Sequence, residues 1–399
     1  MKRIFMGLAV AWMAAGSVWA VSPSVSDVVV SQRWPWSRRV DIDFVLDCDP
    51  GQEIDIAVEG GCGDKLSPLP LSSLAGDLRG IGRGAHRIVW TPVREGETTP
   101  ETLASFRIKL TPSPSLLEYM VIDVSGGKTA ENFPVSYYTN DVPHGVTNDI
   151  YKTTHILLRK IPHGRFMMGA PDASVPVVLT RDFYIGVYEV TPALGERVWG
   201  CFPPYPSKPG IRFVDIRGSE KGILWPQTTD VDPNSFLGIL RGKTGIGTLD
   251  LPTEAQWEYA CRAGTTTAFN DGSDSLISPD YISRLAIWAG NAGGSAAPLQ
   301  VGLKLPNRWG LYDMHGNSVE FCLGRGPVAA LTGGIDPLGV TNNVTGDYMK
   351  DKFIIRGGSF QDSYSEGHLE SLSSYSREST GAVFRHPSRG FRIAYTPEP

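Results

Sequence analysis

The density of glycine and proline constrains this chain more than any other feature of its sequence. Forty-five glycines and 30 prolines make up about one in five of the 399 residues, and they recur without an obvious period. Both residue types interrupt helices, glycine through its backbone freedom and proline through its missing N–H donor. With 41% hydrophobic residues to form a core, the chain is expected to be a loop-rich globular protein of short elements. A helical bundle is excluded.

The N-terminus has the pattern of an export signal. Lys2 and Arg3 give a basic start, a nearly unbroken apolar run follows, and Val18 and Ala20 stand at −3 and −1 of a cut after residue 20. We expect residues 1–20 to be a signal peptide. The mature chain would then be periplasmic, secreted or displayed at the cell surface.

Charge and hydropathy argue against a membrane segment and against a nucleic-acid partner in the mature chain. No later run reaches 18 apolar residues, so no integral membrane segment is predicted. The net charge is −5 and no run of Lys or Arg stands out. A nucleic-acid partner is therefore not expected, because phosphate binding needs a basic surface.

Five cysteines are available for oxidation in an exported chain. Cys48 and Cys62 lie close together in the first part of the chain, and Cys261 and Cys322 lie in the second, so these are the candidate disulfide pairs. Cys201 is the odd one. The alternative interpretation is that the cysteines are small buried hydrophobic residues. No spacing of Cys or His predicts a zinc site.

Residues 21–140 are expected to form an all-β sandwich of immunoglobulin-like or fibronectin-like type. Apolar and polar residues alternate in short runs, as strands with one wet face require, and Gly- or Pro-containing turns separate them. Residues 141–155 are polar and turn-rich and are expected to be a linker. The expected strands are 40–44, 53–56, 86–91, 106–110, 119–124 and 134–138.

Three short helices are predicted beyond residue 155 from capping signals. The remainder of that region is expected to be strand and long irregular loop. The helix signals are Thr191-Pro192, Asp232-Pro233 with a stop at Gly245, and the capping box Thr253-x-x-Gln256 with a stop at Gly264.

Six segments of this region carry motifs that occur in the same order in one protein family. They read PHGRFMMG (162–169), FYI and EVT (183–191), LPTEAQWEYA (251–260), GLYDMHGN (310–317), RGGSF (356–360) and GFR (390–392). Together they resemble the sulfatase-modifying-factor family, whose founding activity is the formylglycine-generating enzyme. The resemblance implies that residues 156–396 form an α+β C-type-lectin-like domain with much irregular structure.

The resemblance also indicates where the family's copper site would lie, but this chain lacks the copper ligands at those positions. In the founding enzyme, two cysteines five residues apart follow the RGGS segment and hold Cu(I). Here Asp362 and Gly367 occupy those positions, and no cysteine follows Cys322. A carboxylate is too hard a ligand for Cu(I) and glycine offers no side chain, so copper is not expected. The remaining candidate catalytic residues, which would need a different metal, are Asp362, Glu366 and His368.

The residues that match a calcium site of the family are better preserved than those that match its copper site. The family wraps an ion with a side-chain oxygen, two backbone carbonyls and a glutamate, and the matching positions are Asp313, Gly316, Ser318 and Glu320. Hard oxygen ligands suit Ca²⁺, so the resemblance implies structural calcium. The alternatives are a turn cap for Asp313 and an ion pair between Glu320 and an arginine of the RGGSF or GFR segment.

The predicted function is that of an exported, non-catalytic binding module. The segment from Ser359 to Arg377 is rich in serine and tyrosine, as recognition loops are, although an ordinary surface loop has the same composition. The expected partner is an exported protein or peptide, a sulfatase by analogy, or a cell-surface glycan. The alternative is an active formylglycine-generating oxidase that acts on a sulfatase cysteine. The candidate ligand-binding residues are Ser359, Phe360, Gln361, Asp362, Tyr364, Tyr375 and Arg377.

Overall fold

The structure is a computed structural model, and it describes part of the chain. The described residues are 22–32, 39–50, 52, 54–62, 66–69, 73–78, 80–91, 106–114, 118–200, 211–218, 228–274, 279–325, 328, 331–339, 351–363 and 368–397. The expected signal peptide and Cys201 lie outside these residues.

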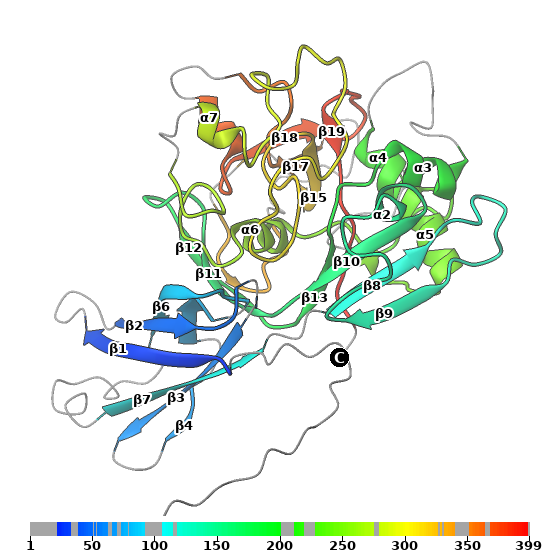
Figure 1. Cartoon of the computed structure of the whole chain (residues 1–399). Coiled ribbons are helices and arrows are strands. Elements are labelled where there is room, and N and C mark those ends of the chain that lie inside the picture. The colour runs from blue at the N-terminus through cyan, green and yellow to red at the C-terminus, as the bar shows by residue number, and fades with distance from the viewer. Residues whose placement is uncertain are drawn as a thin grey trace, which may run out of the picture.

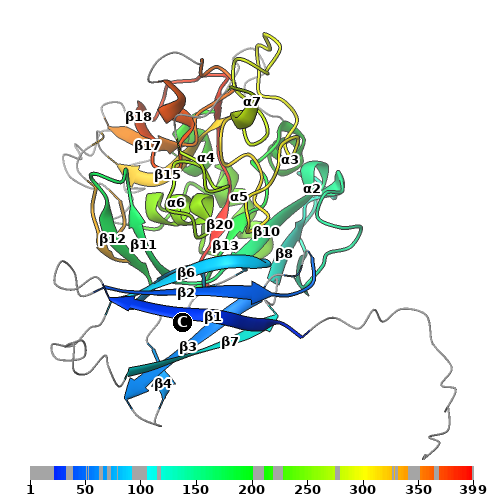
Figure 2. The same ribbon diagram turned by 60° about the vertical axis from the view of Figure 1, so that its left-hand side comes forward.

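Two antiparallel sheets form the N-terminal unit and lie face to face (Figures 1 and 2). Their strands occupy the runs in which apolar and polar residues alternate. One sheet has the order β1 (Ser24–Gln32), β2 (Val40–Asp47), β6 (Gly84–Trp90), β5 (Leu74–Gly76). The other has the order β4 (Ser67–Pro68), β3 (Ile54–Cys62), β7 (Phe106–Pro114).

The core of this unit follows from the two-residue period of its strands. Ile42, Phe44 and Leu46 alternate along β2 and are buried in one cluster with Ile54 and Ile56 of β3. Successive side chains of a strand point to opposite faces, so each sheet contributes one apolar face to the interior.

Strands β8 (Glu118–Asp123) and β9 (Val135–Thr139) do not join these sheets. They extend a six-stranded sheet of the C-terminal unit, because β8 pairs with β10 (His155–Ile161). The sequence pattern predicted that these strands belong to an N-terminal domain of residues 21–140. That assignment differs from the structure because alternation shows which face of a strand is buried and says nothing about its partner. The order of the sheet is β14 (Leu249–Asp250), β20 (Ala394–Tyr395), β13 (Phe183–Gly186), β10, β8, β9.

Residues 141–155 are not the solvated linker that their polarity predicted. They contain helix α2 (Ile150–Thr153) and the start of β10. Val142 and Tyr151 are buried in the C-terminal core, and the Tyr151 hydroxyl donates to the Pro143 carbonyl at 2.6 Å. The segment is therefore part of the C-terminal unit.

The six-stranded sheet is buried on both faces. Met120 and Ile122 of β8 pack into one apolar cluster, while Tyr119 and Val121 pack into another. The first cluster includes α3 (Pro192–Trp199), α4 (Phe213–Arg217) and α5 (Phe236–Thr244), which lie together in Figure 1. The second includes α6 (Glu254–Arg262).

Capping residues begin and end the three predicted helices α3, α5 and α6, with two shifts. Helix α6 ends at Ala263, one residue before the predicted Gly264. Thr191 caps α3, and the Thr253 and Gln256 side chains form the capping box of α6. Helix α5 is capped by Ser235, three residues after the predicted Asp232, and ends at Gly245. The longest described helices have nine residues, and none in the described part of the chain has the length and apolar character that crossing a membrane requires.

Two smaller sheets and several short helices complete the C-terminal unit. Most of the remaining chain is irregular, as the glycine and proline content predicted. One sheet has the order β11 (Gly164–Met168), β12 (Val175–Leu179), β16 (Gly334–Ile335). The other has the order β18 (Arg377–Gly381), β17 (Lys352–Arg356), β15 (Val319–Arg325), β19 (Arg389–Gly390). The short helices are α7 (Pro279–Ile282) and a 3₁₀ turn, His368–Leu372.

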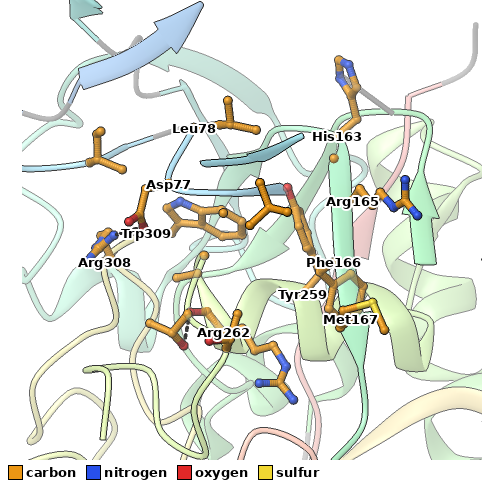
Figure 3. Close-up of a pocket in the computed structure, with 18 of the residues that line it drawn as sticks. Asp77, Leu78, His163, Arg165, Phe166, Met167, Tyr259, Arg262, Arg308 and Trp309 are labelled. Atoms are coloured by element: carbon orange, nitrogen blue, oxygen red, sulfur yellow. Dashed lines mark hydrogen bonds and ion pairs between the residues drawn. The ribbon is translucent and has the colours of Figure 1, made fainter. Parts of the chain in front are cut away.

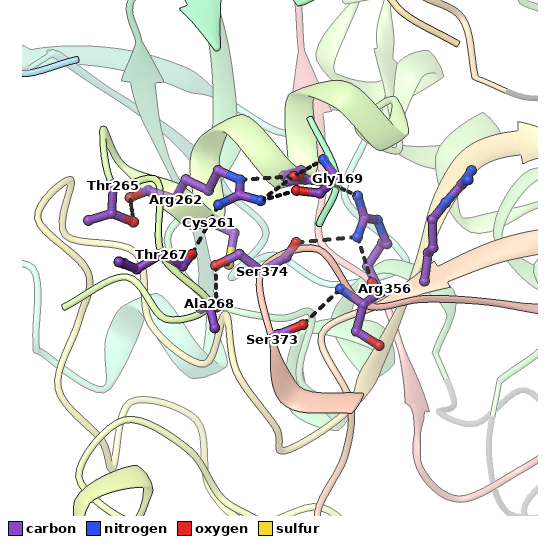
Figure 4. A network of polar contacts seen from close by, with 12 residues as sticks. Gly169, Cys261, Arg262, Thr265, Thr267, Ala268, Arg356, Ser373 and Ser374 are labelled. Atoms are coloured by element: carbon purple, nitrogen blue, oxygen red, sulfur yellow. Dashed lines mark hydrogen bonds and ion pairs between the residues drawn. The ribbon is translucent and has the colours of Figure 1, made fainter. Parts of the chain in front are cut away.

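A buried charge network ties these irregular segments to α6. The Glu258 carboxylate accepts hydrogen bonds from Arg262 Nε at 2.8 Å, from Gly169 N at 2.7 Å and from Arg356 of β17. Arg262 also donates to the carbonyls of Gly169 and Thr267 at 2.9 and 3.0 Å (Figure 4). The Glu258 carboxylate, together with Arg262, therefore connects α6, β17 and the loops of Gly169 and Thr267.

The substitution Glu258→Gln should destabilise the protein strongly. Glu258 has no exposed surface, and removing its charge leaves two buried guanidinium groups undercompensated. The expected loss is about 3–5 kcal/mol in the free energy of unfolding, measured by urea titration. The exposed Glu196→Gln on α3 is the control, expected to stay within about 0.5 kcal/mol of wild type. An unchanged urea midpoint for Glu258→Gln would contradict this account of the network.

Candidate functional site

The predicted ligand segment leaves β17 through two glycines in the left-handed region. Gly357 has a φ of 95° and Gly358 a φ of 68°. A Cβ at Gly358 would lie 2.8 Å from the Ser371 carbonyl oxygen, so only glycine fits there. This turn places Ser359 against the buried side of the loop, where it is 4% exposed.

Asp362, at the first of the two family cysteine positions, stabilises the loop itself. Its Oδ2 atom accepts hydrogen bonds from Ser359 N at 2.5 Å and from Ser359 Oγ at 2.9 Å, and its carbonyl accepts from Ala289 N at 3.0 Å. The other two catalytic candidates are Glu366 and His368. Glu366 and the side chain of His368 lie outside the described residues, as does Gly367.

Three of the ligand-binding candidates are directed into the protein. Phe360 is buried with Ile287. The Arg377 guanidinium binds both oxygens of Glu254, at 2.6 and 2.7 Å. Tyr375 is partly buried, with its ring 5.9 Å from the Arg262 guanidinium.

The exposed part of the segment is small in the described residues. Gln361 and Ser363 are exposed, and Tyr364 lies outside the described residues. A depression lined by Gly358, Ser376 and neighbours has a volume of about 10 Å³, and its lining includes neither Gln361 nor Ser363. That volume holds about one water molecule.

The described thiols are buried and free. Cys261 lies 3.6 Å from Ser374 Oγ (Figure 4), whereas Cys322 contacts the Glu320 carbonyl. The candidate bridge between Cys261 and Cys322 is therefore not formed, because each thiol packs against different neighbours. Cys48 is also free, and the side chain of its candidate partner Cys62 lies outside the described residues.

Burial makes these thiols unreactive. It raises the pKa of the Cys261 thiol to about 12, and it raises the pKa of Cys322 well above its usual value. The thiolate is the form that binds soft metals and attacks substrates. Neither cysteine is thus poised for copper chemistry.

The predicted calcium residues meet in one tight turn. Asp313 and Gly316 have φ values of 55° and 77°, and a Cβ at Gly316 would lie 2.1 Å from the Ile287 carbonyl oxygen. Asp313 is 2% exposed, and its Oδ2 accepts from Gly302 N at 2.7 Å. Its Oδ1 is buried without a hydrogen-bond partner. Burial raises the pKa of Asp313 to about 6.

Glu320 forms the ion pair that was the alternative to a calcium role. Its carboxylate binds Arg392 of the GFR segment through Nε at 2.6 Å and Nη2 at 2.5 Å. Trp257 Nε1 also donates to it at 2.7 Å. Each carboxylate oxygen has two acceptor sites, so Oε1 retains one.

A second buried glutamate, Glu189, contacts this turn from the segment after β13, and no sequence pattern predicted it. Glu189 accepts from Asn317 Nδ2 at 2.7 Å and from Ser318 N at 2.9 Å. Burial, Asp313 and Glu320 together raise the pKa of Glu189 well above its usual value. Its position in the EVT motif was the available signal. The carboxylates of Glu189, Asp313 and Glu320 therefore interact electrostatically with one another around the guanidinium of Arg392.

Comparison with known proteins places these features in a family. Residues 206–397 match the sulfatase-modifying factor enzyme 1-like domain. No functionally curated protein matches the chain.

Several solved structures resemble the chain at low identity. They include Treponema denticola variable protein 1 (21% identity, 61% of this chain and 96% of that one, TM-score 0.45), PvdO from Pseudomonas aeruginosa (21%, 61% and 95%, 0.45) and CarF (17%, 60% and 97%, 0.37). The matched residues contain four of the six motif segments in their order, at 251–260, 310–317, 356–360 and 390–392. The matched region, residues 206–397, is therefore a sulfatase-modifying factor enzyme 1-like domain, and the described C-terminal unit that contains it is largely β and irregular.

Proposed function

We propose that this chain is an exported, non-catalytic binding protein built on a sulfatase-modifying-factor domain. The observation that carries the proposal is the loss of the copper cysteines. Asp362 and Gly367 take their positions, and no cysteine follows Cys322. The Asp362 carboxylate accepts two hydrogen bonds from Ser359, so the residues present do not fit copper.

The oxidase alternative would need a thiolate elsewhere. Cys261 and Cys322 are fully buried and their pKa values are raised. Both properties oppose metal binding and attack on a substrate cysteine. The family fold is therefore proposed to serve recognition in this chain.

The proposed ligand is an exported protein or peptide. The residues Gln361 and Ser363 are exposed, and the segment that carries them is rich in serine and tyrosine, as recognition loops are. This exposed polar surface is proposed to form a protein interface. A cell-surface glycan is the alternative outcome of a binding test. The N-terminal sheets are proposed to be an immunoglobulin-like or fibronectin-like spacer, and residues 1–20 a signal peptide.

Structural calcium is proposed for the acidic turn. Asp313 offers a buried carboxylate oxygen that has no partner, and Glu189 and Glu320 bring more negative charge than Arg392 neutralises. No three His, Cys, Asp or Glu side chains of the described residues form a metal-binding group. The remaining ligands would therefore be the carbonyls of Gly316 and Ser318, as hard oxygen donors that suit Ca²⁺. The ion would fix the turn and take no part in chemistry.

An aldehyde assay tests the non-catalytic assignment. The purified protein, with copper, reductant and oxygen, is incubated with a peptide containing Cys-x-Pro-x-Arg, and the cysteine is followed by mass spectrometry. We expect no formylglycine, because Asp362 cannot supply the soft ligand that Cu(I) needs. A known active enzyme run in parallel validates the assay. Conversion of the peptide by this chain would refute the proposal.

Calcium should stabilise the protein through Asp313. With Ca²⁺ at about 100 times its Kd, binding contributes ~2.7 kcal/mol, which raises Tm by about 5–10 °C relative to EDTA. Asp313→Asn should lose this response. In EDTA the variant should unfold at the same temperature as wild type or higher, since it removes buried negative charge beside Glu189 and Glu320.

The exposed Asp280→Asn serves as the matched control and should keep the calcium response. Differential scanning calorimetry measures all three proteins. Equal Tm values for wild type in Ca²⁺ and in EDTA would exclude the calcium site.

A further inference from the structure

A cavity of about 620 Å³ lies in the C-terminal unit, where residues of α2, α3 and β19 come together. Helices α2 and α3 are neighbours in both views of the chain (Figures 1 and 2). The loop 296–301 forms another wall of the cavity. Its volume is in the range of sites that bind organic molecules of drug size. The exposed residues Gln361 and Ser363 do not line this cavity.

Apolar side chains form much of the lining. The start of α3 contributes Pro192 and Ala193, and the loop 296–301 contributes Pro298 and Leu299. These residues are partly or largely exposed in the chain. A ligand with an apolar body would remove their surface from water, which is favourable.

A hydroxyl group without a hydrogen-bond partner is part of the same lining. Ser318 lines the cavity and is 5% exposed. Its backbone N–H donates to Glu189, whereas its Oγ atom makes no hydrogen bond with a described residue and is not sealed from solvent. A Cβ at Gly390, which also lines the cavity, would lie 3.2 Å from this Oγ. The hydroxyl is therefore available to a ligand in the cavity.

Arg389 brings a guanidinium group that has no carboxylate partner among the described residues. One of its N–H groups donates to the Phe384 carbonyl, and the others remain as donors. Burial lowers the pKa of Arg389, and no carboxylate in the described part of the chain offsets this effect. The Lys152 ammonium differs, because it is paired with Asp149 at 3.0 Å.

The charged side chains of the lining balance in sign. Lys152 and Arg389 are basic, and Asp149 and Glu189 are acidic. Both oxygens of Glu189 already accept hydrogen bonds within the acidic turn. An anion would be repelled by Glu189 and a cation by Arg389, so the balance favours an uncharged ligand.

A smaller cavity, of about 270 Å³, lies between the two units (Figure 3). Several of its charged side chains are paired within the protein. Arg308 binds Asp77 at 2.9 Å, and Arg262 binds Glu258 at 2.8 Å. The cavity beside α3 differs because Arg389 retains donors that no described carboxylate uses.

We propose that the cavity beside α3 binds an uncharged small molecule that has an apolar body and a carbonyl or comparable hydrogen-bond acceptor. The body would lie between the start of α3 and the loop 296–301. The acceptor would receive hydrogen bonds from the Ser318 hydroxyl and the Arg389 guanidinium. This site is independent of the proposed protein interface, because Gln361 and Ser363 take no part in it.

The test titrates the full protein into Nile red, an uncharged dye with an apolar body and a carbonyl acceptor. The fluorescence of this dye rises when it moves from water into an apolar site. Calcium is held constant throughout, because Ser318 also belongs to the acidic turn. We expect a saturable rise with one dye molecule bound per chain. No saturable rise with protein up to about 100 µM would overturn the proposal, since it excludes even a weak site.

Filling the cavity should prevent binding. Ala193→Trp places an indole in the lining from α3, and Ala297→Trp places one from the opposite loop, so the second variant serves if the first does not fold. Each should weaken dye binding about tenfold or more, because the indole occupies the space of the ligand. Ala173→Trp, at an exposed position outside the lining, is the matched control and should bind as wild type does. Wild-type affinity in the filled variants would overturn the proposal.

Two further variants and a second dye test the polar contacts and the charge. Ser318→Ala and Arg389→Met each remove donors and should weaken Nile red binding about fivefold. The exposed Arg284→Met is the control. Anilinonaphthalene sulfonate, an anionic dye, should bind wild type less tightly than Nile red does. Tighter binding of the anionic dye, or unchanged Nile red affinity in both donor variants, would overturn the assignment.

Discussion

Four buried arginines hold the irregular C-terminal unit together. Arg217, Arg325, Arg356 and Arg392 are all at most 1% exposed. Each binds a carboxylate from another part of the chain, and Arg217, for example, binds Asp250 at 2.8 and 2.9 Å. A guanidinium has five donors in a fixed plane and can bind carboxylates and loop carbonyls together. Because the C-terminal unit has few long helices or strands, these arginine contacts connect its loops, as backbone hydrogen-bond ladders connect segments in more regular folds.

The same interactions explain how the family fold can exist without copper ligands. The network around Glu258 and Arg356, and the pair of Glu320 with Arg392, lie within α6, β15, β17 and the GFR segment. The positions that match the family's copper cysteines by resemblance lie in the loop after β17, where Asp362 forms local contacts. Fold and chemistry therefore depend on different residues, and a loop can change its function while the buried charges stay.

The sequence predicted the features that depend on neighbouring residues. The caps at Thr191 and Thr253 act within one helical turn, so a short window contains all the information. The partner of β8 lies farther along the chain, and no local pattern encodes it. The contacts of Glu189 could not be predicted for the same reason, because they are made with residues distant in the sequence. The resemblance to known motifs supplied the long-range arrangement that residue patterns did not.

The six-stranded sheet has a consequence for the order in which the protein can assemble. Strand β20, at Ala394–Tyr395, lies between β13 and β14 rather than at an edge of the sheet. During synthesis its residues appear after those of every other strand of the sheet. Until then, β13 and β14 have no shared neighbour and the backbone groups that face β20 remain unpaired. The six-stranded sheet can therefore close only once residues 394–395 are available to pair, a late step that joins segments far apart in the chain.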